Sequence, residues 1–583
     1  MGTRPVKAAD LANLREQALA AERAGDRDTA MQRMAHAVEL AGDHAALLNS
    51  AGGLALRLDR RENALAWYRK AFRLVPDSIE YATNFAIALH RFGHHDEALA
   101  TLSGFEFSAQ RDARYFATRG HVERALSLLD DAAKSYDGAL SLQPDHARAM
   151  HGRARIALER ADDDVVARYE AALRLNSNDP ELLLGYAQAL EITGRNDDAL
   201  ALSERLNAAA PRWTDALSQT AQLRLARGDD NFTAPYYEAA LRAPDDAAIR
   251  LEWARQLAGL DRFSEAADVA ANARRAFPDD PRFALLEAVH AGEAGDDARA
   301  GAIFAELSGR SATRDLHEAR HWIRLGDQEQ AEALLLRVLD ERPFDIGAWA
   351  LRSICWRLSG DSRLEWLHGQ DTLVQRLPLP LEPQSLRTVC AVLHALHERS
   401  SLPLGQSVRG GSQTRGRLFA RSTPEIQRLH RAVMGALDSY RAALPDRDDR
   451  HPLLRFRDTP WRTDGSWSVR LNSSGFHAAH IHPKGCVSSA IHLELPDTDG
   501  MDRAGWLELG RPPRDLRLNL PPERMVEPRR AHLVLFPSTL YHGTRPFEGG
   551  RRMTVAFDVV PRGTKLGLAF RRFKPAMKKG GGT

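Results

Sequence analysis

The chain has 583 residues, and its 80 Lys and Arg residues nearly balance its 78 Asp and Glu residues, which leaves a formal charge of +2. This balance argues against a nucleic-acid partner, because proteins that bind nucleic acids usually carry a basic excess or a patterned basic face. No apolar run approaches the ~18 residues that a membrane-spanning helix requires, so no membrane partner is expected. The length allows several domains of about 100–200 residues each.

The three cysteines, Cys355, Cys390 and Cys486, are far apart, and no CxxC pair occurs. A disulfide framework or a structural zinc site is therefore not expected, and the chain fits a reducing compartment. The first residues contain no apolar run of the kind found in signal peptides. Together these features predict a cytoplasmic protein.

The first 375 residues contain an internal repeat. Prolines that follow helical runs are separated by 68, 67, 33, 34 and 65 residues, and they are Pro76, Pro144, Pro211, Pro244, Pro278 and Pro343. Each spacing is close to one or two units of about 34 residues. Later units are degenerate, and prolines are missing near Asp112 and near Ala312, where the period expects them.

Small and aromatic residues recur at fixed distances before these prolines. Gly52 and Ala64 precede Pro76 as Gly120 and Ala132 precede Pro144, and the aromatic positions are Tyr68 and Tyr136. The small residues allow two antiparallel helices to approach closely, the aromatic fills the space toward the next repeat, and the proline ends the second helix. This pattern resembles the tetratricopeptide repeat family. The resemblance implies nine to eleven helix pairs between about residues 10 and 375, with a concave surface that binds a protein or peptide.

The pattern changes after residue 375. The proline-rich segment 376–384 predicts a linker, and residues 376–400 are assigned to this linker and a leading helix. Residues 424–444 are amphipathic, with Leu429, Val433, Leu437 and Tyr440 on one face, and predict a helix.

From Trp467 onward the apolar runs shorten to strand length. They occupy residues 466–471, 477–483, 486–496, 505–510, 531–537 and 552–560, and Gly, Pro, Asp and Asn separate them. Such runs predict an all-β domain, a sandwich or a barrel, over residues 401–565. The basic segment 566–583 is expected to be a solvated tail. The fold class is therefore a multidomain α+β chain, in which an all-α solenoid precedes a β domain.

Histidines of the β region are spaced for metal binding. His480 and His482 are two residues apart, and residues at this spacing on a strand point to the same face, so both imidazoles can reach one metal. His542 follows the strand-like run 533–537, and Arg552 and Thr554 lie ten and twelve residues beyond it.

This order resembles the Fe(II)/2-oxoglutarate-dependent oxygenases, and most closely a bacterial and phage branch of that family. The motifs that carry the resemblance are SVRGGSQT (407–414), HIHP (480–483), GWLELGRPP (505–513), LVLFPSTLYHGTRPF (533–547) and RMTVAFDVV (552–560). It implies a double-stranded β-helix of the jelly-roll type, with Fe(II) bound by His480, His482 and His542. It also implies that Arg552 and Thr554 bind the distal carboxylate of 2-oxoglutarate and that O2 is a cosubstrate.

The chain departs from the family pattern at two places. His482 stands where most oxygenases have a carboxylate ligand, so the three ligands are neutral and the identity of the metal stays open. Ile491 and His492 occupy two tyrosine positions of the branch, and His492 is expected to replace a tyrosine contact with the cosubstrate. Strand alternation favours Arg552 over Arg551 as the carboxylate-binding residue, because Arg552 and Thr554 share a face. The remaining histidines, His477 and His532, and Trp467 are expected to be surface or packing residues.

Three functions fit these observations. The first is an oxygenase, a hydroxylase that acts on a protein or peptide delivered by the repeats. The second is an interaction scaffold with a degenerate oxygenase domain. The third is a cupin-like three-histidine metal enzyme, which ranks last because cupins usually place a Glu shortly after the HxH and because Arg552 and Thr554 would then have no role.

Overall fold

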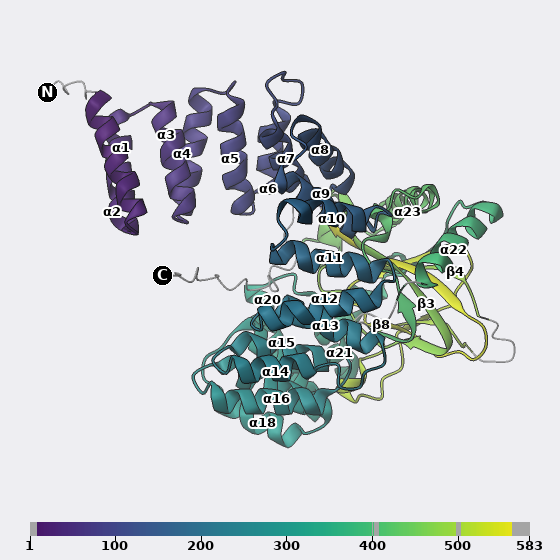
Figure 1. Cartoon of the computed structure of the whole chain (residues 1–583). Helices are drawn as coiled ribbons and strands as arrows, with labels where there is room; N and C mark the ends of the chain where they lie inside the picture. Colours follow the sequence, from purple (N-terminus) through teal and green to yellow (C-terminus); the bar gives the residue numbers. More distant parts are fainter. Residues whose placement is uncertain (1–7, 399, 401–406, 497–502, 562–583) are drawn as a thin grey trace. The chain divides into compact units, whose positions relative to one another are not determined.

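The computed structural model describes residues 8–398, 400, 407–496 and 503–561 (Figure 1). The predicted basic tail, 566–583, lies outside the described residues. The chain forms two compact units, an N-terminal unit of residues 1–159 and 163–182 and a C-terminal unit of residues 160–162 and 183–583. The division between them falls inside the predicted solenoid and not at the boundary predicted near residue 375.

The solenoid consists of twenty-one helices within the described part of residues 8–360. They are α1 (Ala8–Arg23), α2 (Arg27–Ala41), α3 (Ala45–Arg57), α4 (Arg61–Leu74), α5 (Ile79–Arg91), α6 (His95–Ser103), α7 (Ala113–Ala125), α8 (Leu129–Leu142), α9 (Ala147–Arg160), α10 (Val165–Leu175), α11 (Pro180–Ile192), α12 (Asn196–Ala209), α13 (Thr214–Ala226), α14 (Ala234–Arg242), α15 (Ala247–Ala258), α16 (Phe263–Ala276), α17 (Pro281–Ala294), α18 (Asp297–Glu306), α19 (Ala312–Leu325), α20 (Gln328–Glu341) and α21 (Ile346–Ser359). From α3 to α21, the first helices of successive pairs begin 31 to 34 residues apart. The predicted period and the predicted nine to eleven pairs are confirmed.

The packing inside the repeats follows the predicted roles of the small and aromatic residues. A Cβ added to Gly52 would lie 2.7 Å from the ring of Tyr68. The ring of Tyr136 occupies the same kind of space, because a Cβ at Gly120 would lie 2.9 Å from it and a Cβ at Gly152, in the next repeat, 2.4 Å from it. Each tyrosine therefore fills a space that only glycine leaves open.

At the two repeats where the expected proline is missing near Asp112 and Ala312, a side chain caps the first helix. Asp112 accepts a hydrogen bond from the Tyr115 backbone N–H at 2.7 Å, at the start of α7. Ser311 accepts one from the Arg314 N–H at 3.2 Å, at the start of α19. Such N-caps satisfy backbone donors that a helix leaves unpaired. The repeat phase is thus preserved where the proline signal fails.

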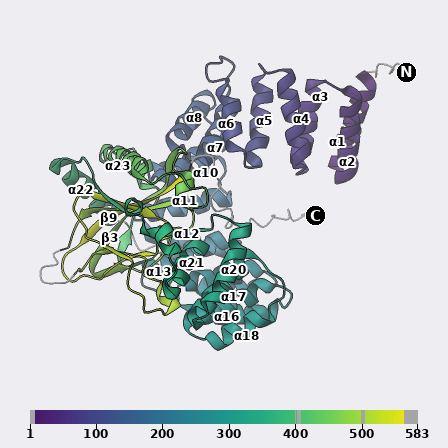
Figure 2. The ribbon, with the colours of Figure 1, turned by 180° about the vertical axis from the view of Figure 1, so that it is seen from behind.

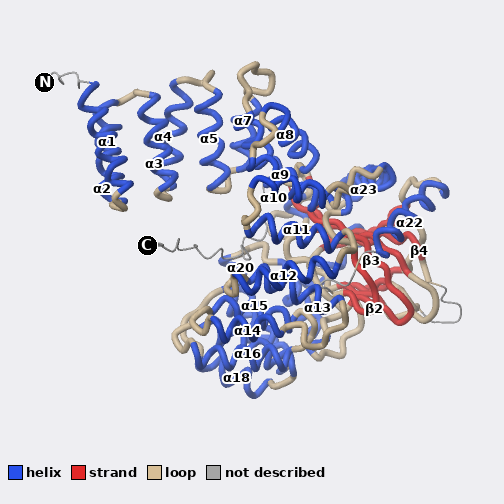
Figure 3. The backbone as a smooth tube through the Cα atoms, viewed as in Figure 1, coloured by secondary structure: helices blue, strands red, loops and turns tan. Residues whose placement is uncertain are grey.

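The β domain of the C-terminal unit consists of two antiparallel sheets that form the predicted jelly roll (Figure 3). The major sheet has the order β1-β7-β4-β9-β3-β2 and the minor sheet the order β6-β5-β8. The strands are β1 (Gln375–Pro378), β2 (Val408–Gln413), β3 (Trp461–His477), β4 (Val487–Glu494), β5 (Leu507–Leu509), β6 (Arg524–Val526), β7 (His532–Pro537), β8 (His542–Thr544) and β9 (Arg552–Pro561).

The proline-rich segment 376–384 is not simply a linker. Residues 375–378 form β1, which pairs antiparallel with β7 at the edge of the major sheet. Proline is tolerated on an edge strand because one side of that strand makes no ladder hydrogen bonds, so the prolines concealed a strand. The leading helix is α22 (Pro383–Glu398), and the helix predicted at 424–444 is α23 (Pro424–Ala443).

The two faces of the major sheet have different roles. On β9, Met553, Val555, Phe557 and Val559 belong to a hydrophobic core that also contains the buried faces of α22 and α23. The alternate residues of β9 include Arg552, Ala556 and Asp558, which line a cavity on the opposite face. This alternation gives one strand a packing face and a site face.

Within the C-terminal unit, the repeats contact the β domain directly (Figure 2). Ion pairs join Glu191 of α11 to Arg415, Asp261 to Arg409, Arg320 of α19 to Asp515, and Asp297 to Arg517. Hydrogen bonds from Arg357 of α21 to backbone carbonyls add to these contacts. Among the described residues, no helix has both the length and the apolar character that crossing a bilayer requires.

Candidate metal site

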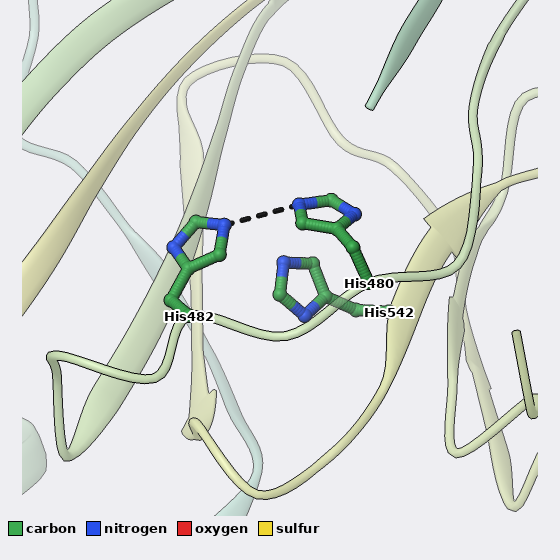
Figure 4. Close-up of side chains that lie close together, drawn as sticks. All are labelled: His480, His482 and His542. Carbon is green, nitrogen blue, oxygen red and sulfur yellow. Dashed lines mark hydrogen bonds between the residues drawn. The ribbon is translucent and has the colours of Figure 1, made fainter. Parts of the chain in front are cut away.

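Three histidines meet at one point between the two sheets (Figure 4). His480 and His482 lie in the segment that connects β3 to β4, and His542 is the first residue of β8. The backbones of His480 and His542 form an isolated antiparallel bridge, with N–H to O distances of 3.1 and 2.9 Å. The prediction that the HIHP motif lies on a strand is therefore wrong, although the pairing with β8 still directs both imidazoles of the motif toward His542.

The Nδ1 atom of each histidine contacts an acceptor that fixes the ring. Nδ1 of His480 lies 2.8 Å from the Ala478 carbonyl, and Nδ1 of His542 lies 3.2 Å from the Leu540 carbonyl. Nδ1 of His482 bonds to the carboxylate of Asp558. Since a carbonyl or carboxylate only accepts, each Nδ1 carries the proton and each Nε2 presents a lone pair.

The arrangement of the rings fits one shared metal ion. The Nε2 atoms of His480 and His482 are 3.0 Å apart, and one potential ligand atom from each of the three residues lies within 4.8 Å of the others. Two nitrogens that bind one metal at about 2.1 Å, at right angles, would be separated by about 3 Å. The ring centroid of His542 lies 4.3 Å from that of His480 and 4.9 Å from that of His482.

Burial keeps the site histidines in the form that binds metals. Desolvation lowers the pKa of His480 and of His542 well below the ordinary value, and the neighbouring imidazoles lower it further. Neutral imidazole is the ligand form of histidine, so these side chains need not lose a proton at neutral pH before a cation binds.

Asp558 places a negative charge beside the site, where the third ligand is a neutral histidine in place of the usual carboxylate. Its carboxylate accepts from Nδ1 of His482, and the two side chains are 17% and 12% exposed. Sequence reasoning missed this residue, although it lies six positions after Arg552 and therefore on the same face of β9. A carboxylate behind a ligating histidine orients the ring and raises its basicity.

We expect Asp558→Asn to weaken metal binding by roughly 10- to 100-fold, which is the usual effect of removing a partner of a metal-ligating histidine. Asparagine retains an acceptor for His482 but not the charge. Anaerobic titration with Fe(II) measures the affinity. Asp464→Asn is the matched control, because Asp464 is the register partner of Asp558 on β3 and pairs with Arg462. Equal affinities of the Asp558 variant and the wild type would contradict this role.

A cavity of about 370 Å³ adjoins the three histidines, and Arg552 lines it. The Arg552 side chain is buried, at 2% exposure, and its Nε and Nη1 atoms have no hydrogen-bond partner among the described residues. Burial lowers the pKa of Arg552 to about 10, so the guanidinium stays charged at neutral pH. A buried cation without a partner is costly, and an anion bound in the cavity would relieve that cost.

The other predicted cosubstrate residues, His492 and Thr554, lie next to Arg552 but do not line the cavity. Nη2 of Arg552 donates to Nδ1 of His492 at 3.3 Å, and His492 is 0% exposed. Thr554 is the register partner of His492 and shares a strand face with Arg552. Neither His492 nor Thr554 is among the residues that line the cavity. His492 therefore supports the guanidinium, and its side chain does not line the cavity in which a cosubstrate would lie.

His477 and Trp467, which were expected to be surface or packing residues, line the cavity instead. The His477 ring lies 6.1 Å from that of His480, and the Trp467 ring lies 5.4 Å from that of His482. By contrast, Nδ1 of His532 bonds to the Arg530 carbonyl away from the site, and Arg551 is exposed. His532 is the register partner of His492 but does not line the cavity, so residue type alone does not reveal which histidine lies at the site.

Comparison with known proteins supports both parts of the chain. Residues 465–558 match the family described as "Putative 2OG-Fe(II) oxygenase", and residues 113–165 and 166–212 match the tetratricopeptide repeat family. Over 215 residues the chain is 29% identical to the protein FlbA of Caulobacter vibrioides, and the aligned part is 36% of this chain and 35% of that protein. The chain thus spans about a third of the length of this curated relative.

Solved structures with a similar backbone include further repeat proteins. A tetratricopeptide repeat protein from Parabacteroides merdae matches with a TM-score of 0.35 and 19% identity, over 42% of this chain and 98% of that one. PilW, a type IV pilus biogenesis factor, matches with a TM-score of 0.33 and 15% identity, over 36% of this chain and 98% of that one.

Proposed function

Because the chain joins a tetratricopeptide repeat array to a domain of the 2OG-Fe(II) oxygenase type, we propose that it is an Fe(II)/2-oxoglutarate-dependent oxygenase that hydroxylates a protein or peptide. His480, His482 and His542 would hold Fe(II), and Arg552 would bind the distal carboxylate of 2-oxoglutarate, with Thr554 and His492 beside it. The reducing environment expected for three free, buried thiols fits activity in the cytoplasm.

The buried guanidinium of Arg552, which has no anionic partner among the described residues, is the observation that carries this proposal. A scaffold that had lost catalysis would have no reason to keep a buried charge unpaired, since its removal would stabilise the fold. A cupin-like three-histidine site would explain the metal ligands and not Arg552. A dicarboxylate with one end at the metal and the other at Arg552 explains both features.

The residues around the cavity have separate tasks in this reaction. When bound, Fe(II) with 2-oxoglutarate supplies the O2 chemistry that oxidises a C–H bond. The three histidines would hold the metal, and a site with only three protein ligands would leave positions for the cosubstrate and O2. Arg552 orients the cosubstrate through the planar, charged fork that matches a carboxylate. Trp467 and His477 form part of the wall against which the substrate would lie.

The test is an anaerobic titration of the purified protein with Fe(II) and then 2-oxoglutarate. We expect stoichiometric iron binding, followed by the weak visible charge-transfer band of chelated 2-oxoglutarate. Iron binding without the band would favour the cupin-like function. Loss of both iron binding and the band would favour the scaffold with a degenerate domain.

We also propose that the partner binds to the N-terminal unit. In the C-terminal unit, helices α11, α19 and α21 already contact the β domain. In the N-terminal unit, polar side chains form a row across successive first helices. Asn84 of α5 donates to Asn49 of α3 at 2.9 Å, and the exposed Arg114 of α7 donates to Asn84. Amide side chains can donate to and accept from a peptide backbone.

Peptides that bind the wild-type protein can be selected from a displayed library. We expect these peptides to bind the Asn84→Ala variant with much lower affinity. Removal of the central amide of the row leaves peptide donors and acceptors unpaired, which costs about 1–3 kcal/mol for each buried group. Calorimetry measures the affinity, with Asn272→Ala in α16 as a control outside this unit. Selected peptides that bind both variants equally would place the partner elsewhere.

A further inference from the structure

We propose that the last repeats of the solenoid are a structural part of the metal site, with Arg320 of α19 as a positioning residue for His542. The inference rests on the proposed function, because it concerns the affinity and geometry of the same three-histidine site. All the residues involved lie in the C-terminal unit.

Both metal-binding segments are anchored in the core of the repeats by the residue next to a ligand. Ile481, between His480 and His482, packs against a hydrophobic cluster built mainly from α19, α20 and α21. Tyr541, immediately before His542, is a buried member of the same cluster, at 5% exposure. The histidines therefore meet in the site, while Ile481 and Tyr541 beside them contact the core of the repeats.

Polar contacts fix the same segment from α19. Nη1 of Arg320 donates to the hydroxyl of Tyr541 at 3.3 Å, and Nη2 of Arg320 pairs with the carboxylate of Asp515. Asp515 belongs to η5 (Arg514–Leu516), and the neighbouring Arg517 donates to the Gly292 carbonyl of α17 at 2.8 Å. One guanidinium thus joins two loops of the β domain to the surface of the repeats.

A second set of contacts holds the turn before His542. Nε2 of His368, which lies in η1 (Glu365–Gly369) after the last repeat helix, is 3.0 Å from the hydroxyl of Thr539, and Nδ1 of His368 is 3.1 Å from the Glu523 carboxylate. The Tyr541 carbonyl accepts from the Gly510 N–H at 2.6 Å, and the Gly510 carbonyl accepts from Arg357 of α21. The turn 538–541 is therefore supported from α19, α21 and η1.

The metal site needs this external support because its own backbone is irregular. His480 has a single bridge to His542, and His482 lies in no strand. Residues that are not fixed by a sheet ladder must be held by packing and by the contacts behind them if a metal site is to keep its geometry. In this chain, the repeats supply that packing.

The experiment compares Arg320→Met with Arg352→Met in the full-length protein. Arg352 belongs to α21, pairs with Glu332 and lies over Trp349 and Trp356 in the same cluster, so its loss disturbs the repeats without removing a contact to Tyr541. Co(II) is the probe, since its visible spectrum reports ligand geometry. We expect Arg320→Met to weaken Co(II) binding at least 10-fold and to alter the spectrum, while Arg352→Met retains both.

Two milder variants keep the test informative if Arg320→Met fails to fold. Tyr541→Phe removes only the hydroxyl and should weaken binding by a smaller factor, and Arg320→Lys should recover part of the loss because it can still pair with Asp515. Wild-type affinity and spectrum in both Arg320→Met and Tyr541→Phe would overturn the inference, as would equal losses in the Arg320 and Arg352 variants. A wild-type protein that binds no Co(II) or Fe(II) would instead remove the proposed function, and this inference with it.

Discussion

Arg552→Met should abolish measurable binding of 2-oxoglutarate while leaving Fe(II) binding intact. Removing one member of a buried, hydrogen-bonded charge pair costs about 2–5 kcal/mol, which raises the Kd by roughly 30-fold to several thousand-fold. The anaerobic charge-transfer band measures cosubstrate binding, and a separate titration measures the iron. Arg551→Met is the matched control, because Arg551 is the adjacent residue and is exposed.

The same substitution should not destabilise the protein in the absence of 2-oxoglutarate. Two nitrogens of Arg552 are buried and have no partner in the described part of the chain, so methionine replaces a desolvated charge with an apolar side chain of similar length. Thermal unfolding should therefore occur at the wild-type temperature or above it. A variant that unfolds several degrees lower and still shows the band would mean that Arg552 serves the fold and not the cosubstrate.

His542→Ala should eliminate stoichiometric Fe(II) binding. His542 provides one of three ligands and lies at the centre of the histidine cluster, with its ring within 5 Å of both other rings. Loss of one ligand from three removes a large part of the metal affinity, and alanine keeps the backbone bridge to His480, so the loss reports the missing imidazole. Iron content after anaerobic loading and desalting measures the effect.

His532→Ala is the control for this second prediction, because Nδ1 of His532 bonds to the Arg530 carbonyl and His532 does not line the cavity. The control should retain its iron. A His542 variant that holds one equivalent of iron with unchanged affinity would show that the metal is bound elsewhere or by other residues.

Much of the fold could be predicted from the sequence because its local signals agree with its packing. The 34-residue period, the glycine and tyrosine positions and the helix at 424–444 reflect contacts within one repeat or one helix. Strand β1 was not predicted, because Pro378 and the prolines that follow it resemble a linker and its partner β7 is about 155 residues away in the sequence. The end of the compact N-terminal unit near Leu182 also has no local signal, since it falls at the start of α11, where the repeat period continues unchanged.

The candidate site could be predicted to a similar extent. The three histidines and Arg552 have a recognisable order along the chain, and the structure brings the histidines together. The role of Asp558 depends on which strand lies beside the HIHP segment, and that pairing is set by tertiary structure. The contacts of Arg320, Ile481 and Tyr541 depend on the association of the repeats with the β domain. No local sequence pattern predicts that association, because the segments lie far apart along the chain.

The anchoring of Ile481 and Tyr541 in the repeats limits how this protein can be divided or recombined. The family match covers residues 465–558, but a fragment confined to the β domain would expose Tyr541 and Leu516 to water and leave Asp515 without its cation. Exposed apolar surface of this kind favours aggregation. The smallest transferable module is therefore larger than the matched segment and includes α19 to α21, so an exchange of repeat arrays between relatives would succeed only at a junction upstream of α19.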